Sequence, residues 1–265
     1  MNWRAMAYSS ETRGFLPPVN DAERLCMKRV ADQIHAVKQT ETARTTTFLN
    51  EREQILAIAQ LNRNGHKEYI FEGGYPEAER KMLCIFSDAL PENAFSIVSI
   101  FIAVRGGAVL THRDYLGALM ALQIKREQIG DILTSETGAT VFLTSKMATF
   151  VCDTLCEIGR FSATVTRIEL PLAPQTAQEP AWLTATVSSL RLDALLAAML
   201  KTSRSVAAEY IRTKAVMINH VETTDIHGAV YAGDIFSVRG KGKYKLCEIS
   251  GKSKKDRTFV SYIQY

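Results

Sequence analysis

Three stretches in the last third of the chain decide the fold: SSLRLDALLAAML at residues 188–200, KTSRSVAAEYIRTKAVMIN at residues 201–219 and AGDIFSVRGKGKYK at residues 232–245. The first predicts an amphipathic helix, because five apolar residues share the spacing of one helix face: Leu192, Leu195, Leu196, Met199 and Leu200. The second predicts another helix, capped by Ser203 or Ser205, and then a short strand at residues 216–218. This second helix buries Ala207, Tyr210 and Ile211.

Basic side chains lie near the ends of these two predicted helices, outside their apolar stripes: Arg191, Arg204, Arg212 and Lys214. A small core that displays cations in this way suits the phosphate backbone of a nucleic acid. The later run RGKGKYK has glycines that allow a hairpin backbone to approach phosphate closely. It adds four further cations: Arg239, Lys241, Lys243 and Lys245. A solvated basic turn is the alternative interpretation of this run.

The distribution of charge separates the last third from the rest of the chain. Residues 184–265 hold 13 Lys and Arg against 7 Asp and Glu, a net charge of +6. Residues 1–183 hold 19 against 21, a net charge of −2, so the overall +4 combines a basic C-terminal part with a nearly neutral body. This asymmetry indicates a polyanionic partner for the basic part, or a basic surface that only solvent covers.

Length and composition are those of an ordinary soluble globular protein, with 265 residues, 46% of them hydrophobic and 23% charged. No apolar run approaches the roughly 20 residues that span a bilayer, and the N-terminus lacks the apolar segment of a secretory signal. The five cysteines are dispersed, and Cys152 and Cys156 fit core packing better than metal binding. The prediction is a cytoplasmic protein without membrane insertion, metal or cofactor.

Residues 1–78 predict a mainly helical N-terminal domain. Its first helix runs through residues 21–38, with an apolar face formed by Cys26, Val30, Ile34 and Val37. A second helix begins at Asn50, which stands at capping-box spacing from Glu53. A short strand then leads to Gly73 and Gly74, which predict a turn or a close approach of the backbone to a ligand.

Residues 79–170 alternate strands and helices and predict a plait-like middle domain with its helices on one face of the sheet. Strands are predicted at residues 82–87, 96–105, 140–144 and 161–170, and a turn at the end of residues 125–132. A helix at residues 145–159 is predicted to bury Met147, Phe150, Val151, Leu155 and Ile158. The proline-rich residues 171–183 predict a linker to a C-terminal domain at residues 184–265, so the fold class is α+β with three small modules.

Candidate catalytic motifs have simpler explanations. The HRD triplet at residues 112–114 matches a kinase catalytic loop, but the position that needs a metal-binding Asn is Leu119. Helix capping explains this triplet and leaves Arg113 available to a partner. The RLD tripeptide at residues 191–193 is similar to one with a catalytic Asp in some pseudouridine synthases. Only 72 residues follow Asp193, however, and a carboxylate is favourable in the first turn of a helix. No catalytic residue is therefore predicted.

The C-terminal part resembles the RNA-binding domain named after small-subunit ribosomal protein four, called here the S-four-type (αL) domain. That pattern consists of RLD, a helix, SR at the start of a second helix, I-R-x-G-x-V-x-V-N and a later GD. The matching positions are residues 191–193, 203–204, 211–212, 216, 218–219 and 233–234. Lys214 and His220 depart from the pattern, because glycine is usual at both positions.

The body of the chain narrows the resemblance. FEGGYPEAER at residues 71–80, LTHRDYLGALMALQIKREQIGDI at residues 110–132 and SVRGKGKYK at residues 237–245 resemble the YlmH family of bacterial RNA-binding proteins. Gln123 stands where that family has Gly, and Lys241 where an apolar residue is common. The resemblance implies association with the large ribosomal subunit, rRNA and tRNA, quality control of stalled peptidyl-tRNA complexes together with protein partners, and a connection to cell division.

The leading hypothesis is a monomeric, non-enzymatic RNA-binding factor. Its predicted RNA-binding residues are Arg191, Ser203, Arg204, Arg212, Lys214, Asn219, Arg239, Lys241, Lys243 and Lys245. A second contact from the middle domain would use Arg113, Lys125 and Arg126. The alternatives are an RNA-modifying enzyme with its site in the middle domain and a cell-division adaptor protein. The hypothesis requires that the cations share a surface and are not consumed by internal ion pairs.

Overall fold

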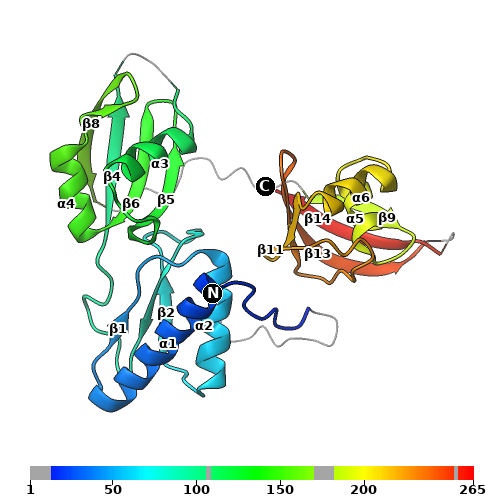
Figure 1. The fold of residues 1–265 in the computed structure, drawn as a ribbon, viewed down its shortest axis with the longest axis horizontal. Helices are drawn as coiled ribbons and strands as arrows, with labels where there is room; N and C mark the ends of the chain where they lie inside the picture. The colour runs from blue at the N-terminus through cyan, green and yellow to red at the C-terminus, as the bar shows by residue number, and fades with distance from the viewer. Residues whose placement is uncertain (1–12, 106–108, 170–181, 254–255) are drawn as a thin grey trace. The chain divides into compact units, whose positions relative to one another are not determined.

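The computed structural model describes residues 13–105, 109–169, 182–253 and 256–265 (Figure 1). The chain forms two compact units, one from residues 18–176 and one from residues 1–17 together with residues 177–265. Most of the predicted linker, residues 171–181, lies outside the described residues, and its last two residues, Trp182 and Leu183, already belong to a strand of the second unit.

The first unit begins with two helices packed on a small sheet. Helix α1 (Asp21–Thr40) and helix α2 (Glu51–Arg63) contact each other, and strands β1 (Arg44–Thr45), β2 (Tyr69–Glu72) and β3 (Met82–Ile85) form an antiparallel sheet in the order β1-β3-β2. The predicted apolar face of α1 is confirmed, because Val30, Ile34 and Val37 are buried and Cys26 packs against them. The predicted capping box is also present: Asn50 Oδ1 accepts from Glu53 N, and Glu53 Oε2 accepts from Asn50 N.

Strand β3 belongs to a different module from the one predicted. The sequence predicts that residues 82–87 belong to the middle domain. In the structure, Met82–Ile85 pair with β2 over four residues and with β1 over two. Burial explains the difference, since all four residues of β3 are buried and need an apolar partner on both faces. The N-terminal module is therefore two helices on a three-stranded sheet, and it extends at least to Ile85.

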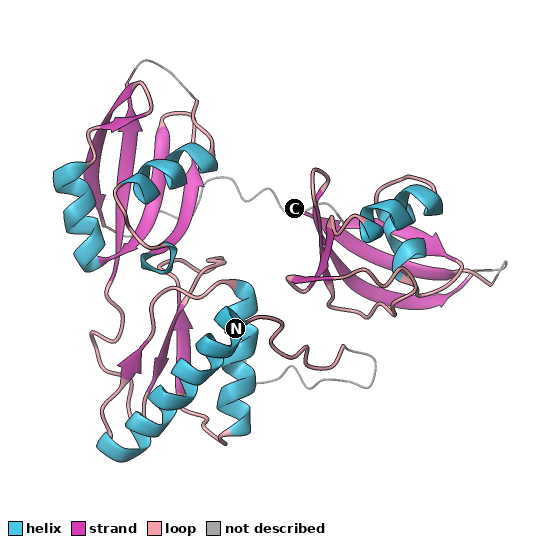
Figure 2. Cartoon of the chain, viewed as in Figure 1, coloured by secondary structure: helices cyan, strands magenta, loops and turns pink. Residues whose placement is uncertain are grey.

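The second module of this unit is a five-stranded antiparallel sheet with both helices on one face (Figure 2). Its strands are β4 (Ile97–Val104), β5 (Ile129–Thr134), β6 (Gly138–Thr144), β7 (Glu157–Ile158) and β8 (Phe161–Ile168), in the order β5-β6-β4-β8-β7. Helices α3 (His112–Ala121) and α4 (Ser145–Thr154) pack on the face that carries Ile100, Ile102 and Val141. The predicted plait-like arrangement of helices is confirmed.

Two local predictions in this module are wrong. The segment at residues 125–132 continues from a short 3-10 helix, η2 (Arg126–Gln128), into strand β5 and does not end in a turn. Helix α4 ends at Thr154, and Phe150 is 41% exposed instead of buried. The face of α4 that packs on the sheet carries Ala148 and Val151, so Phe150 lies to one side of it.

The two modules of the first unit meet at Gly74 and Asp131. Gly74 has φ +97°, and a Cβ there would lie 2.6 Å from the ring of Phe142, so the glycine serves both a left-handed turn and a close approach. The next residue, Tyr75, stacks on Phe142 and donates its hydroxyl to Asp131 Oδ2 at 2.8 Å. Burial, followed by the charge of Asp131, raises the pKa of Tyr75 well above its ordinary value. The close approach predicted for the glycine pair is thus to protein.

Arginines surround the same joint and donate to backbone carbonyls. Arg80 donates to the carbonyl oxygens of Ile129 at 2.9 Å and Phe48 at 3.1 Å, while Asp131 accepts from the backbone N–H of Arg80 at 3.1 Å. Burial lowers the pKa of Arg80 below its ordinary value. These bonds connect the loop after β2 to the start of β5.

The C-terminal part of the second unit packs two helices on one face of a six-stranded antiparallel sheet. The helices are α5 (Leu192–Met199) and α6 (Arg204–Arg212). The strands are β9 (Trp182–Val187), β10 (Val216–Ile218), β11 (Val221–Glu222), β12 (Ile235–Val238), β13 (Gly242–Lys252) and β14 (Thr258–Gln264), in the order β11-β10-β12-β13-β14-β9. Both predicted helices and the strand after them are present, and the predicted apolar stripe of α5 lies in the core.

Candidate RNA-binding surface

A buried carboxylate holds two arginines side by side at the starts of α5 and α6. Asp193 is 5% exposed because it lies in the first turn of a helix that is buried on nearly all sides. Arg204 donates to Asp193 Oδ2 from Nη2 at 2.7 Å and from Nε at 3.1 Å. Arg191 donates to both carboxylate oxygens at 3.1 Å and also contacts His227 Nδ1. We call Arg191, Asp193 and Arg204 the arginine pair site.

The electrostatics of this site follow from the same contacts. Burial raises the pKa of Asp193, but hydrogen bonds from Arg204 and Arg191 outweigh burial, so the pKa lies below its ordinary value. The carboxylate is therefore ionised at neutral pH, and the three groups carry a net charge of +1. The side chains of Arg191 and Arg204 are still 38% and 49% exposed, which leaves part of each guanidinium accessible to a ligand.

A second group of cations gathers at the other end of α6. Arg212 ends the helix, Lys214 follows it, and the backbone N–H of Arg239 donates to the carbonyl of Ala215 at 2.8 Å. The turn between β12 and β13 therefore adjoins the end of α6 and adds Lys241. Arg212 and Lys214 form exposed ion pairs with Glu209 and Glu222, at 3.5 and 3.3 Å, and such pairs exchange readily for other partners. We call Arg212, Lys214, Arg239 and Lys241 the helix-end cluster.

Lys214 has a positive φ of 56° for a structural reason. Its N–H donates to Ile211 O, and the N–H of Ala215 donates to Tyr210 O, which is the bonding pattern of a Schellman motif. Glycine is favoured at this position because a Cβ is strained there. The chain places a lysine there instead, and its ammonium belongs to the helix-end cluster.

Lys243 and Lys245 lie on the face of the C-terminal sheet that is turned away from α5 and α6. Successive residues of a strand point to opposite faces, and in β13 it is Tyr244 and Leu246 that are buried against the helices. The two lysines therefore project from the far side of the sheet, where Lys243 lies 5.5 Å from the centre of the Tyr265 ring. They do not extend the helix-end cluster.

Two predicted RNA contacts serve the fold. Ser203 is the N-cap of α6, and its hydroxyl oxygen accepts from Val206 N at 3.3 Å. Asn219 donates to Asp234 Oδ1 at 2.8 Å and accepts from Ile235 N at 2.9 Å, so its side-chain amide joins two strands. These bonds use the amide oxygen and one of the two amide N–H groups, so Asn219 has a structural role and its contact with RNA stays a prediction.

A residue far away in the sequence completes that buried site. Arg13 donates to both carboxylate oxygens of Asp234, to the carbonyl of Ala229 at 2.6 Å, and lies over the ring of Tyr231. Asp234 is 1% exposed, so its charge needs this guanidinium. Sequence reasoning did not select Arg13, and an isolated arginine in an irregular segment offered no signal for it.

The proposed second contact in the middle module does not form a single patch. Arg113 lies at the start of α3, where the predicted cap is confirmed by bonds from the N–H and hydroxyl of Thr111 to Asp114 Oδ2 at 2.8 and 2.7 Å. Lys125 is exposed beyond the other end of α3. Arg126 donates to the carbonyls of Ile129 at 2.6 Å and Gly130 at 3.2 Å, and burial lowers its pKa to about 10. Arg126 therefore has a structural role, and its contact with RNA stays a prediction.

Within the described ranges, no three side chains of His, Cys, Asp or Glu gather closely enough to hold a metal ion. No helix among the same residues combines the length and the apolar character needed to cross a membrane.

Comparison with known proteins identifies relatives for most of the chain. Residues 22–90 match the family model "YlmH, N-terminal", and residues 94–171 match the model "Putative RNA-binding domain in YlmH". A Bacillus subtilis protein named ribosome-associated protein quality control protein P2 is 31% identical over 243 residues, which cover 91% of this chain and 94% of that protein.

A solved structure supports the fold alone. The protein described as cell division protein ylmH from Streptococcus pneumoniae superposes with a TM-score of 0.51 at 19% identity. The match covers 59% of this chain and 96% of that structure.

Proposed function

Because this chain belongs to the YlmH family, we propose that it is a non-enzymatic RNA-binding factor that associates with the large ribosomal subunit through rRNA and tRNA. Its role would be the quality control of stalled peptidyl-tRNA complexes in the cytoplasm, as a monomer that acts with other quality-control proteins. The printed name of the Bacillus subtilis relative supports the ribosomal part of this proposal.

The observation that carries the proposal is the arginine pair site. A buried carboxylate fixes two guanidinium groups before any ligand arrives, so less side-chain entropy is lost when they bind phosphate. Arg191 and Arg204 both pair with this carboxylate and still remain partly exposed. Part of each guanidinium can therefore bind a ligand. This arrangement is suited to an anionic ligand with more than one phosphate.

The helix-end cluster extends the same surface along α6. Arg204 and Arg212 begin and end this helix, and eight residues of α-helix span about 12 Å. The two groups of cations can therefore contact separate phosphates of one folded RNA. A-form RNA hides its base edges in a deep major groove, so recognition by shape and phosphate is the expected mode.

The decisive experiment is RNA binding by the full chain as a function of salt. We expect binding of a structured rRNA or tRNA fragment to weaken on the order of a thousandfold between roughly 50 and 200 mM salt, as for about six phosphate contacts. The Arg204→Ala and Arg212→Ala variants should each flatten the salt slope by about one unit. Weak or salt-insensitive binding by the wild type would overturn the proposal.

The matched control is Arg24→Ala. Arg24 and Arg212 are both exposed helix residues paired with a carboxylate three positions away, but Arg24 lies on α1 in the other unit. Its loss should leave the salt slope unchanged, which separates a specific surface from a general effect of charge.

The rival functions predict different outcomes. An RNA-modifying enzyme predicts a missing nucleotide modification in rRNA or tRNA of a deletion strain. A cell-division adaptor, for which the name of the Streptococcus pneumoniae structure gives a reason, predicts septal localisation that survives Arg204→Ala together with Lys214→Ala. Cross-linking to rRNA and tRNA in cells would instead favour the ribosomal factor.

A further inference from the structure

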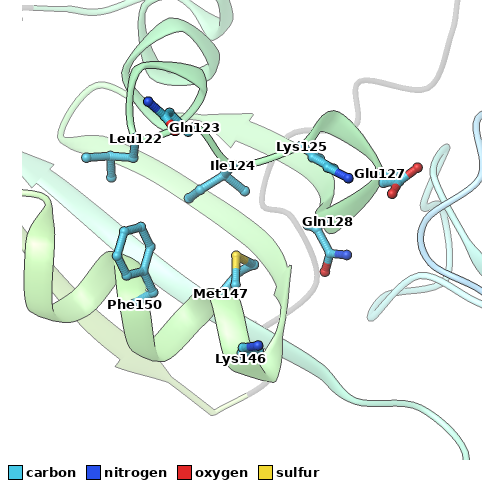
Figure 3. A pocket seen from close by; sticks show the side chains of 9 residues that line it. All are labelled: Leu122, Gln123, Ile124, Lys125, Glu127, Gln128, Lys146, Met147 and Phe150. Atoms are coloured by element: carbon cyan, nitrogen blue, oxygen red, sulfur yellow. The ribbon is translucent and has the colours of Figure 1, made fainter.

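A pocket of about 420 Å³ opens between the end of α3 and the first turns of α4, on the helix side of the middle module (Figure 3). This volume lies within the roughly 300–1,000 Å³ of small-ligand sites. Residues from three segments line it: Leu122 and Gln123 follow α3, Lys125 precedes η2 and Gln128 ends it, and Lys146 and Phe150 belong to α4.

The lining is chemically divided. In Figure 3, Leu122 and Phe150 lie at one end, with Gln123 beside Leu122, and Lys125, Glu127 and Gln128 lie at the other end. Phe150 is 41% exposed, so one part of its ring is available for stacking. A ligand with a flat apolar part and an anionic part matches this division.

The charge of the pocket lining as a whole is positive on balance. Lys125 and Lys146 are both exposed, and the one carboxylate in the lining, Glu127, lies 3.8 Å from the guanidinium of Arg29. The pairing offsets the negative charge of Glu127 and leaves the two ammonium groups available to an anion.

The polar end also offers a hydrogen-bond donor with a defined orientation. The hydroxyl of Thr144 donates to Gln128 Oε1 at 2.8 Å, so the amide oxygen is already used. The amide nitrogen, which can donate two hydrogen bonds, is the end that a ligand can use. Unpaired bases present acceptor atoms on their Watson–Crick edges.

We propose that this pocket holds an unpaired nucleotide of the RNA, with its base stacked on Phe150 and its phosphates at Lys125 and Lys146. This inference rests on the proposed function and assigns the RNA site of the module that matches the RNA-binding family model at residues 94–171. Its affinity would add to that of the C-terminal surface, because linked modules bind one RNA at high effective concentration.

The other face of the same sheet is a poorer candidate. Its described strand residues include Ser99, Phe101, Thr140, Thr164 and Thr166, and none of them is charged. Uncharged side chains such as these give the phosphate backbone little electrostatic attraction. The part of that face around Phe142 is covered by the N-terminal module, which contributes Phe48 and Met82 to one core cluster.

The test uses the full chain and an RNA stem–loop with one 2-aminopurine in its loop, whose fluorescence falls when the base stacks. Wild type should quench this probe, and Phe150→Ala should abolish the quenching and weaken binding about tenfold, the size expected for one base–aromatic stack. Phe150→Tyr should retain both. The Lys125→Ala, Lys146→Ala double variant should weaken binding and flatten the salt slope by more than one unit.

Two control substitutions match these variants. Met120→Ala removes an exposed apolar side chain of α3 that does not line the pocket, and Lys28→Ala removes an exposed cation of α1. Both should bind and quench like wild type. Circular dichroism of each variant checks that it is folded.

The outcomes separate this inference from the proposed function. A wild type that does not bind RNA would overturn the proposed function. A wild type that binds, with unchanged affinity and quenching in Phe150→Ala and in the double lysine variant, would overturn the pocket assignment alone. If Phe150→Ala and the double lysine variant bind RNA like wild type but no longer bind a poly-glutamate peptide, the pocket belongs to a protein partner. This result would also overturn the pocket assignment.

Discussion

Two regions of this molecule bring arginines to a buried aspartate, and they use them differently. At Asp131 the carboxylate accepts from Tyr75 and from two backbone N–H groups, and the nearby Arg80 and Arg126 donate to backbone carbonyls. At Asp193 the carboxylate accepts from Arg191 and Arg204 themselves. In the first region the arginines complete the hydrogen bonding of a joint, and in the second they are presented at a surface.

The difference teaches that the partner of an arginine is more informative than its charge. Carbonyl oxygens consume donors in a fixed geometry, and burial of the guanidinium shows in the lowered pKa of Arg80 and Arg126. When two arginines share a single carboxylate, that carboxylate accepts from only some of their guanidinium N–H donors, and the three groups together keep a positive net charge.

The largest effect is expected at the joint. Asp131→Ala should lower the free energy of unfolding by about 3 kcal/mol, because two backbone N–H groups and the Tyr75 hydroxyl lose their acceptor. Hydrogen exchange of the β5 and β6 amides in the full chain measures this loss locally. Asp153→Ala, which removes an exposed carboxylate of α4, should change stability by less than about 0.5 kcal/mol. Equal effects of the two substitutions would contradict the structural role of the joint.

At the surface, Asp193→Asn should weaken RNA binding about tenfold even though it makes the protein more basic. The reason is that Arg191 and Arg204 lose the anchor that orders them before binding. Fluorescence anisotropy with a structured RNA measures the change. Asp256→Asn adds the same charge at an exposed site and should leave affinity equal or slightly higher. If both variants bind more tightly than wild type, charge alone governs the surface.

The same carboxylate predicts a dependence of stability on pH. The pKa of Asp193 in the folded protein lies below its ordinary value, so its contribution to stability is present in full above about pH 3.9 and is lost as the pH falls through the folded pKa. The difference in unfolding free energy between wild type and Asp193→Asn should be constant from about pH 7 to 5 and disappear in stronger acid. A difference that persists there would point to another cause.

A substitution at the end of α6 should separate stability from binding. Lys214→Gly removes a strained Cβ at φ +56° and should raise the free energy of unfolding by about 1 kcal/mol, while RNA affinity falls because a cation is lost. Lys214→Ala keeps the strain and should reduce affinity without the gain in stability. Urea unfolding and anisotropy on the same samples give both numbers, and a glycine variant that binds as well as wild type would remove Lys214 from the surface.

The smallest effect is expected on the far side of the C-terminal sheet. Lys243→Ala and Lys245→Ala should each change RNA affinity less than about twofold, because both side chains point away from α5 and α6. Their charges can attract RNA bound at the helices only over a long distance, where salt screens the attraction. A loss as large as that of Arg204→Ala would show that the RNA wraps around to this face.

Periodicity was enough to predict most helices and strands from the sequence. The stripes of α1 and α5, the caps at Asn50 and Thr111, and the basic C-terminal part all followed from spacing and residue type. The sequence did not predict strand β5, because Gly130 and Asp131 are unusual in strands. Gly130 is required there, since a Cβ would lie 2.8 Å from the Phe48 ring, and Asp131 is used by the joint.

The candidate surface was less predictable, because sequence shows which residues are charged but not what each one contacts. Arg126 and Lys125 are neighbours in the chain, yet one is bonded to carbonyls and the other is exposed beside a pocket. Alternation along β13 places Lys243 and Lys245 together on the side of the sheet away from the helices. Phe150 looked like a core residue by its spacing on α4, and only the packing of that helix revealed an exposed ring.

The contact of Arg13 with Asp234 has a practical consequence for anyone who dissects this protein. A gene fragment that starts after residue 181 contains every strand and helix of the C-terminal part but omits the guanidinium that neutralises a carboxylate inside it. Such an excised piece would expose or protonate that acid, or repack around it. The modular appearance of the sequence therefore misleads about where the protein can be cut, and a circularly permuted design that joins the first seventeen residues to the end would preserve the pairing.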